Sequence, residues 1–436
     1  MASREELKRM ACEAIDKNRE KVIEIGDSIF AEPELGYKEF KTAEKVKKAM
    51  DEIGLKYESE VAITGIVAPL KGKKSNARLA VMGELDAVVA PEHRCADKIT
   101  GAAHSCGHNC MIAALMGVAY AFQNTGIMEE LSGDIVLMAV PAEEYVEIEY
   151  RNELKKQGKI HFLGGKQEFI KLGAMDDIDM MIMQHSTPND ARGLCGIPNA
   201  GNNGFMGKLI RYIGKEAHSG GAPHLGINAL NAATLGLTAV HMQRETFQDK
   251  DSIRVHPIIT KGGDLVNVVP ADVRIETYIR GANMEAIIDA DKKVSRAFKA
   301  GGDAVGAETV ITDLPGYLPM NLNYDLMDIM YENMIDLFGK DKVEYEGAHM
   351  SGSTDAGDVS YIMPTMQSRI FGITGVGHSS NYEISDKELA YIGAAKCLAM
   401  TAIDLLYGEA EKAIEVKANF KPLMTKEEYL KVWGKL

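Results

Sequence analysis

Four apolar runs in this chain each end just before a residue that can bind a metal ion, and this repetition constrains the fold more than any other feature. Each run is short enough to be a buried strand. The runs are Arg78–Val81, Asp134–Val140, Ile178–Gln184 and Arg369–Ile373, and just past them stand Asp86, Glu143 with Glu144, His185 and His378. In an open α/β sheet, sites are built at the edge formed by the carboxyl ends of the strands. We therefore predict an α/β fold with a central mixed sheet flanked by helices, and a site at that edge.

A short loop motif predicts what this site binds. The segment His104–Cys110 carries two imidazoles and a thiol within five residues, and Gly107 lets the backbone turn tightly enough to direct Cys106 and His108 toward one point. Alone, such a motif also arises by chance, and Glu143-Glu144 alone also fits a solvated loop. Two adjacent carboxylates after a buried strand are, however, costly to ionise unless a cation or a shared proton relieves them. Together these features predict a metal site.

The chain is long enough for two domains. Its 436 residues exceed the roughly 250–300 over which a single core usually grows. From about residue 204 the pattern becomes that of a self-contained α+β unit, with strands expected at 205–213, 252–260, 273–280 and 309–313 and helices at 227–247 and 284–300. Because metal-type residues lie on both sides, we predict a metal-binding domain of residues 1–203 and 314–436, with 204–313 inserted as a lid or dimerisation domain.

Two terminal helices complete the expected architecture. The first is expected to run without a break from residue 3 to residue 30, and Pro33, three residues later, prevents it from continuing. The last, at about 426–433, is expected to pack on the main sheet.

Composition limits the partners and the compartment. The net charge is -14 and Lys and Arg form no concentrated stripe, which argues against nucleic acid or an anionic membrane and favours a small-molecule substrate. Six scattered cysteines do not make a disulfide framework and suit a reducing cytoplasm. We find no apolar signal-peptide core and no run approaching 18 apolar residues, so we expect a cytoplasmic protein that crosses no membrane.

Several motifs, in this order, resemble the M20 metallopeptidase and amidohydrolase family over nearly the whole chain. They are His-Ser-Cys-Gly-His-Asn from 104, Pro-Ala-Glu-Glu from 141, a histidine at 185, Ala-His-Ser-Gly-Gly-Ala-Pro-His from 217, Gly-Gly-Asp-Leu-Val-Asn-Val-Val-Pro from 262 and Gly-His from 377. Ala-Glu-Pro-Glu-Leu-Gly-Tyr from 31 is similar to the aminoacylase-like branch. At Asn109 and over residues 351–360, the sequence resembles aminobenzoyl-glutamate hydrolase and the M20-domain β-alanyl dipeptidases more than it resembles hippurate or auxin-conjugate hydrolases. The hippurate-type enzymes usually have Asp where Asn109 stands.

This resemblance implies a zinc-exopeptidase-like domain that hydrolyses an amide bond in a small N-acyl or aminoacyl amino acid or dipeptide-like substrate. It implies two divalent metal ions per subunit, zinc or manganese with cobalt or nickel as alternatives, and leaves open which group bridges them. Glu143 matches the general base and acid. The matching metal ligands are Cys106, His108, Glu144, His185 and His378.

The resemblance also implies roles for residues around these ligands. Asp86 and His104 would contact the ligands and hold their orientation. In the inserted unit, Asn267 and Arg280 match positions that hold a substrate carboxylate or carbonyl. His218 matches a histidine that reaches the active site of the partner subunit and stabilises the oxyanion. We therefore expect a homodimer formed through the inserted unit.

Two other classes of protein fit parts of the pattern. One is a thiol amidase with Cys106 as nucleophile and His108 or His104 as base, whose activity would survive EDTA or phenanthroline. It leaves the residues at the other strand ends unexplained. The second is a non-catalytic small-molecule binding protein on the same scaffold, which would have no use for a proton-transferring Glu143.

Overall fold

The computed structural model describes residues 2–188, 193–346 and 349–435, and the chain divides into two compact units. The first unit consists of Met1–Ala200, Asn321–Ala348 and Asp358–Glu427. The second consists of Gly201–Met320, His349–Gly357 and Glu428–Leu436. The second unit thus begins and ends a few residues beyond the expected bounds of 204 and 313, and it also includes His349–Gly357 and Glu428–Leu436, which we expected in the metal-binding domain.

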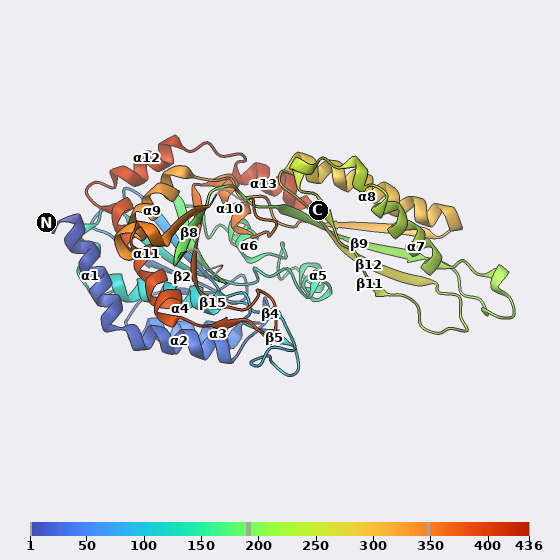
Figure 1. Cartoon of the computed structure of the whole chain (residues 1–436), viewed down its shortest axis with the longest axis horizontal. Coiled ribbons are helices and arrows are strands. Elements are labelled where there is room, and N and C mark those ends of the chain that lie inside the picture. Colours follow the sequence, from blue (N-terminus) through green and yellow to red (C-terminus); the bar gives the residue numbers. More distant parts are fainter. Residues whose placement is uncertain (1, 189–192, 347–348, 436) are drawn as a thin grey trace. The chain divides into compact units, whose positions relative to one another are not determined.

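A nine-stranded mixed sheet forms the centre of the first unit (Figure 1). Its central strands pair in parallel, and shorter strands pair antiparallel with them toward the two sides. The predicted α/β fold with a central mixed sheet is confirmed. In spatial order the strands are β1 (Glu58–Val61), β2 (Gly65–Leu70), β6 (Asp134–Val140), β3 (Arg78–Glu84), β7 (Met180–Pro188), β15 (Thr365–Thr374), β8 (Cys195–Pro198) and β14 (Val343–Glu346), with β16 (Glu383–Ile384) beside β15.

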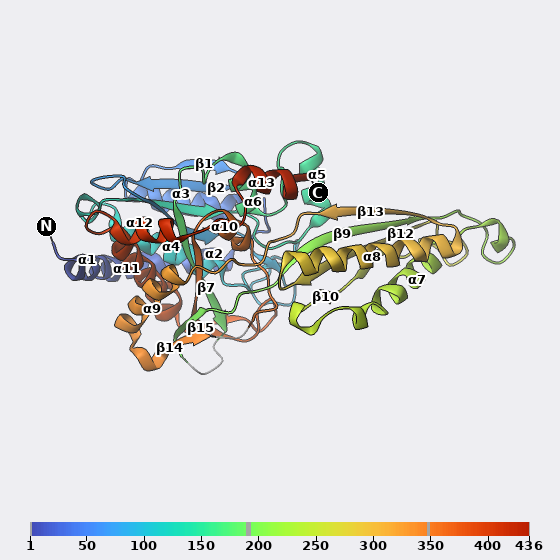
Figure 2. The same ribbon diagram turned by 90° about the horizontal axis from the view of Figure 1, so that it is seen from above.

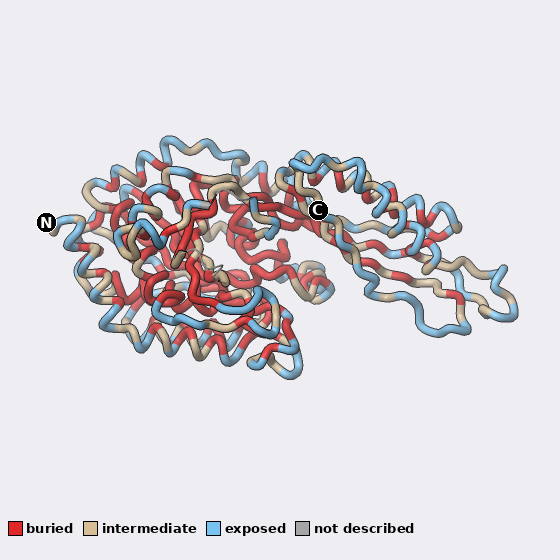
Figure 3. Tube along the Cα trace, viewed as in Figure 1, coloured by how far each residue is buried: buried red, intermediate tan, exposed pale blue. Residues whose placement is uncertain are grey.

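Helices flank this sheet, and their burial follows their composition. Helix α4 is apolar on every side and is buried along its whole length. The outer helices α1 and α2 alternate between buried and exposed residues (Figure 3). The helices other than the two that pack on the five-stranded sheet described below are α1 (Arg4–Lys17), α2 (Arg19–Ala31), α3 (Phe40–Glu52), α4 (His108–Phe122), α5 (Ile148–Lys156), α6 (Gly165–Leu172), α9 (Tyr324–Phe338), α10 (Ala356–Ile362), α11 (Ala394–Leu406), α12 (Glu411–Asn419) and α13 (Lys426–Val432).

The first helix differs from its prediction, because it breaks at Asn18 into α1 and α2. The Asn18 side-chain amide donates to the carbonyl oxygen of Ala14 at 2.9 Å. An asparagine side chain that bonds the backbone competes with the helical ladder and favours a cap over a continuous helix. The apolar periodicity runs through this position and so did not indicate the break.

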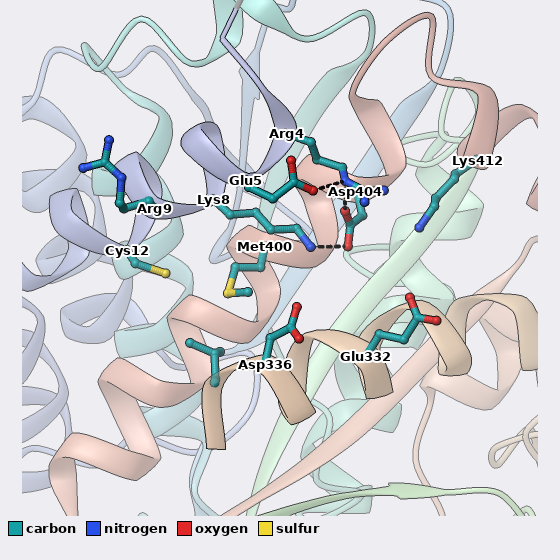
Figure 4. Close-up of a pocket in the computed structure, with 11 residues that line it drawn as sticks. Arg4, Glu5, Lys8, Arg9, Cys12, Glu332, Asp336, Met400, Asp404 and Lys412 are labelled. Atoms are coloured by element: carbon teal, nitrogen blue, oxygen red, sulfur yellow. Dashed lines mark hydrogen bonds and ion pairs between the residues drawn. The ribbon is translucent and has the colours of Figure 1, made fainter. Parts of the chain in front are cut away.

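Ion pairs connect α1 to α11 in a cavity of about 340 Å³ that is lined by charged side chains (Figure 4). Asp404 of α11 is 2% exposed and pairs with Lys8 at 2.7 Å and with Arg4 at 3.4 Å. Its carboxylate also accepts a hydrogen bond from Asn333 at 2.8 Å. Four basic and four acidic side chains line the cavity, so its charges balance, and we assign it to the attachment of the N-terminal helix.

The second unit is an antiparallel sheet with two helices packed on it (Figure 2). Side chains along β12 alternate between buried and half-buried, because one face of the strand packs against the helices. The expected strand at 252–260 is split around Pro257, which has no N–H to donate to the ladder. The elements are β9 (Gly204–Ile213), α7 (Ala229–His241), β10 (Arg254–Val255), β11 (Ile258–Lys261), β12 (Asp272–Gly281), α8 (Met284–Val305) and β13 (Glu308–Leu314).

The C-terminal helix α13 also corrects a prediction. We expected it on the main sheet, but from Glu428 onward the chain belongs to the second unit. The side chains of Tyr429 and Trp433 are buried, and the Trp433 indole donates to the carbonyl oxygen of Gly316 at 3.1 Å. These two aromatic side chains account for the docking, because they are the buried residues of the segment 428–435.

Among the residues that the structure describes, one helix, Glu388–Leu406, is long and apolar enough to cross a membrane by length and composition. Lys396 and Asp404 interrupt it, so it is not an unbroken apolar run. In its most apolar window, 94% is buried inside the protein, as in the core helix of a folded domain.

Candidate metal centre

The candidate residues gather where the central strands end. Strands β3, β6, β7 and β15 are parallel to their neighbours in this group, so their carboxyl ends lie at one edge of the sheet. Glu143 and Glu144 follow β6, His185 lies near the end of β7, and His378 follows β15. The loop that carries Cys106 leads into α4, which begins at His108.

Two groups of metal-binding atoms share the sulfur of Cys106. In the first group, the donor atoms of Cys106, His108 and His185 all lie within 4.8 Å of one another. In the second, the same holds for Cys106, Glu144 and His378. Cys106 Sγ is 3.4 Å from Nε2 of His185 and 3.4 Å from Nε2 of His378. The Cys106 sulfur is therefore the donor atom that these two groups have in common.

The backbone is specialised at two of these positions. Gly107 has φ +95, and a Cβ there would lie 2.5 Å from the Tyr382 hydroxyl, so only glycine fits this turn. His378 has φ +61, in the left-handed region that residues other than glycine rarely adopt. Its backbone N–H donates to the carbonyl oxygen of Ser105 at 2.8 Å, which ties the two loops together. Such local backbone strain is common at functional sites.

The electrostatics favour charged donors. Burial and the nearby Glu144 act to raise the pKa of the Cys106 thiol, but His108 and His185 outweigh them and lower it to about 6. Burial likewise acts to raise the pKa of Glu144, but its bond to His378 lowers it to about 2. These two anionic donors lie beside three imidazoles, of which that of His108 is buried and that of His378 is 52% exposed.

The site fits a pair of divalent ions, because buried donor atoms are left without hydrogen bonds. Within the described part of the chain, the buried atoms His108 Nε2, Glu144 Oε1 and Glu84 Oε2 make no hydrogen bond to a residue outside the candidate metal donors. Their nearest polar neighbours are other candidate donors: His378 Nε2 lies 3.0 Å from Glu144 Oε1, and His108 Nε2 lies 3.0 Å from Glu84 Oε2. Buried polar atoms are normally satisfied, so such atoms indicate a missing partner. A thiolate, imidazoles and carboxylates are donors that zinc and related divalent metals accept.

Asp86 contacts two expected ligands at once. His108 Nδ1 donates to the backbone carbonyl of Asp86 at 2.8 Å, and the Asp86 side-chain Oδ1 lies 3.2 Å from the same nitrogen. The other carboxylate oxygen accepts a hydrogen bond from the backbone N–H of Glu144 at 2.8 Å. This arrangement holds the His108 ring so that its Nε2 faces the donor groups, as expected of a residue that orients metal ligands.

His104 shows no such contact. The side chain is buried, and neither ring nitrogen has a hydrogen-bond partner among the residues that the structure describes. Burial lowers the pKa of His104 to about 3, so the imidazole is neutral. Its expected role in orienting a ligand stays a prediction.

The remaining expected residues lie in the second unit. His218 is exposed, and its Nδ1 accepts hydrogen bonds from the backbone N–H groups of Gly220 and Gly221 at 3.2 and 2.9 Å. Asn267 lies on the segment paired with His218, since Ser219 N donates to Asn267 O at 2.9 Å. Arg280 lies near the end of β12. The structure thus places His218 and Asn267 on adjacent backbone segments.

Sequence reasoning missed two buried charges beside the donors. Glu84 ends β3, and its carboxylate accepts a hydrogen bond from Lys166 of α6 at 2.5 Å. Burial acts to raise the pKa of Glu84, but Lys166 and His108 outweigh it and lower it. Glu84 had a signal, a carboxylate at the end of an apolar strand, whereas Lys166 lies in a polar segment and had none.

Comparison with known proteins identifies relatives along the whole chain. The sequence model of the family described as "Peptidase family M20/M25/M40" matches residues 80–402. Xaa-Arg dipeptidase of Mus musculus is 29% identical over 98% of this chain and 95% of its own length. The N-acyl-L-amino acid amidohydrolase of Geobacillus stearothermophilus is 27% identical over 74% of this chain and 82% of its own length. A solved structure, the YXEP protein of Bacillus subtilis, described as a dinuclear metal binding peptidase from the M20 family, has a TM-score of 0.67 at 19% identity and covers 90% of this chain and 99% of its own.

Proposed function

We propose, from the premise that this chain belongs to peptidase family M20/M25/M40, that it is a metal-dependent hydrolase of an amide bond in a small N-acyl amino acid or dipeptide-like substrate. One observation carries the proposal. Two groups of metal-binding side chains share the Cys106 sulfur, and Glu143, a carboxylate outside both groups, stands beside them. The chain is a hydrolase by its family, as the relatives named dipeptidase and amidohydrolase are.

The side chains divide the reaction among them. When bound, two divalent ions would acidify a water molecule and polarise the amide carbonyl. Glu143 would take a proton from the attacking water at its carboxylate and deliver it to the nitrogen of the leaving amine. Its Oε2 lies 3.9 Å from His108 Nε2, close enough to the donor atoms for that transfer. Asp86 would keep His108 and Glu144 in place, because it contacts both.

We assign the substrate carboxylate to Arg280 and its carbonyl to Asn267. The Arg280 guanidinium donates to Ser353 Oγ at 2.8 Å and to His256 Nε2 at 3.2 Å, and it lies 5.2 Å from the centre of the Phe205 ring. Burial and the Arg280 charge lower the pKa of His256, which keeps that imidazole neutral and able to accept. A guanidinium held in this way loses little side-chain entropy when it binds a carboxylate.

The donor set also bears on the metal and the compartment. Thiolate and imidazole ligands suit zinc, while carboxylates suit manganese, and we propose one of these two as the native metal, with cobalt or nickel as substitutes. All six cysteines are free, which supports our proposal of a reducing, cytoplasmic location.

The test of the proposed function is turnover before and after removal of metal. We expect the purified protein to hydrolyse at least one member of a panel of N-acyl amino acids, aminobenzoyl-glutamate, β-alanyl dipeptides and dipeptides ending in arginine, followed by liquid chromatography. Phenanthroline or EDTA should abolish turnover, and added Zn²⁺, Mn²⁺ or Co²⁺ should restore it. Activity that survives the chelators would favour a thiol amidase. A protein that binds metal but cleaves no amide would be a binding protein.

We further propose a homodimer in which His218 acts at the partner subunit's site, and mixing two inactive variants tests it. An equal mixture of His218→Ala and Glu143→Ala proteins should regain about one quarter of the parent activity, since half of the dimers are mixed and each has one intact site. The measurement is turnover after subunit exchange, with exchange followed by mass spectrometry of differently tagged chains.

The matched control is His224→Ala, which changes a second histidine of the same loop that we assign no role. This variant should be active by itself. If exchange is demonstrated but activity does not return, His218 acts within its own chain or not at all. A monomer in solution would remove the premise.

A further inference from the structure

Glu84 is a buried carboxylate in which one oxygen accepts a hydrogen bond and the other accepts none among the described residues. Its side chain is 1% exposed and ends β3 at the edge of the sheet where the expected ligands gather. Oε1 accepts a hydrogen bond from Lys166 Nζ at 2.5 Å, and the Lys166 side chain has no exposed surface. Oε2 has no hydrogen-bond partner among the described residues. If Glu84 served only to neutralise Lys166, its second oxygen would stay unsatisfied in the protein interior, which is unfavourable.

The unsatisfied oxygen faces the nitrogen that we expect to bind metal. His108 Nδ1 must carry a proton, because it bonds to the backbone carbonyl of Asp86, and a carbonyl oxygen can only accept. In a neutral His108, Nε2 is therefore a lone-pair donor to a metal. Glu84 Oε2 lies 3.0 Å from this nitrogen. Two lone-pair atoms at that distance repel each other unless a proton or a cation lies between them.

A cation fits this position, because three donor side chains converge on it. The donor atoms of Glu84, His108 and Glu143 all lie within 4.8 Å of one another, which makes a third group that shares His108 with the first. Two ligand atoms that bind one ion at about 2.1 Å and at right angles are about 3.0 Å apart. The distance between Glu84 Oε2 and His108 Nε2 is the same, 3.0 Å.

We propose that Glu84 is an additional ligand of the ion bound by His108 and that Lys166 balances its charge. This inference rests on the proposed function only in requiring that the site binds metal. Oε2 donates to the ion while Oε1 stays bonded to Lys166, so the ammonium holds the carboxylate in place. The donor set around that ion then contains Cys106, His108, His185 and Glu84.

Metal affinity, not turnover, tests the proposal, with Zn²⁺ alone as the probe. We expect the parent protein to bind two Zn²⁺ ions per chain in competition with a chelator of known affinity. Glu84→Gln should lower the affinity for one of these ions at least tenfold and leave the affinity for the other unchanged. Losses of about 10–100-fold are typical when a residue that supports a metal site is removed. A glutamine keeps the shape of the side chain but has a neutral, weaker donor.

The double variant Glu84→Gln with Lys166→Met separates the two explanations. If Glu84 binds the ion, the loss of affinity persists in the double variant, because the charged oxygen is still missing. If Glu84 only neutralises Lys166, removing both charges restores the parent affinity, and the proposal is overturned. The double variant also removes the buried ammonium that Glu84→Gln alone would leave facing a neutral amide, so it keeps the test valid if the single variant fails to fold.

A matched control comes from the opposite end of the sheet. Asp134 at the start of β6 has a fully buried side chain and pairs with Lys71 at 2.7 Å. Asp134→Asn also neutralises a buried carboxylate paired with lysine, yet it should leave both Zn²⁺ affinities unchanged. An equal loss there would mean that Glu84→Gln acts through general destabilisation, which contradicts the proposal. A parent protein that binds no Zn²⁺ would instead refute the proposed function.

Discussion

A Glu143→Ala protein is expected to keep both metal ions and to lose turnover by about 10²–10⁴-fold, the usual contribution of general acid–base catalysis. Glu143 lies outside the two groups that share Cys106, so its removal leaves those donors intact. The variant should therefore lack proton transfer alone, lowering kcat much more than it raises KM. The measurement is elemental analysis of the metal content together with steady-state kinetics.

A nearby carboxylate provides the control for this result. Glu147 lies three residues after Glu144 and forms an ion pair with Lys38 at 2.7 Å. Glu147→Ala removes a charge from the same loop without touching the donor groups, and it should retain most of the parent turnover. Glu143→Ala activity above about a tenth of the parent value would rule out Glu143 as general base and acid, because that residue type contributes at least 10²-fold. Loss of metal from the variant would make Glu143 a ligand instead.

The sheet edge could be predicted because burial on both faces leaves a plain signal in sequence. The strands β6 and β7 are nearly continuous apolar runs, so the polar residues that follow them stand out. Parallel pairing then brings Glu144 and His185 to the same edge without any knowledge of strand order. The site therefore depends on a property that the local sequence carries, the point at which each apolar run stops.

Other features depend on contacts between residues far apart in the chain. Lys166 lies in a helix with a polar sequence, yet its side chain is fully buried. It can be buried because its ammonium forms an ion pair with Glu84, which lies 82 positions earlier in the chain. The docking of Trp433 against Gly316 is of the same kind. The break at Asn18 depends on a side-chain bond that competes with an otherwise suitable helical pattern. No periodicity in the local sequence encodes these contacts.

The two histidines of the loop motif show where a motif alone is insufficient. His104 and His108 are equivalent in type and only four positions apart, but only His108 is oriented by Asp86. That difference arises because α4 begins at His108 and directs its ring toward the ends of the strands. The preceding loop instead buries His104, where its ring nitrogens have no hydrogen-bond partner in the described part of the chain.

Cys106→Ser is expected to weaken the binding of both metal ions, whereas His185→Ala should weaken only one. The reason is that Cys106 belongs to both donor groups and His185 to a single group. Serine replaces a soft anionic donor by a neutral hydroxyl, and the pKa of the Cys106 thiol, lowered to about 6, means that the sulfur is anionic near neutral pH. Competition titration with Zn²⁺ should show a lower affinity for both ions in Cys106→Ser and for one ion in His185→Ala. Turnover should be lost in both variants.

The metal readout is what makes this result decisive, because a thiol amidase would also lose activity when Cys106 is replaced. Such an enzyme would lose turnover with its metal content unchanged, and the same chelators would leave the parent active. Cys110→Ala is the matched control, since this buried thiol lies four residues away, outside both groups, and burial raises its pKa to about 12. It should bind both ions as the parent does. If Cys106→Ser did the same and remained active, Cys106 would be a structural thiol, and the two donor groups would have no shared ligand through which to hold a pair of ions.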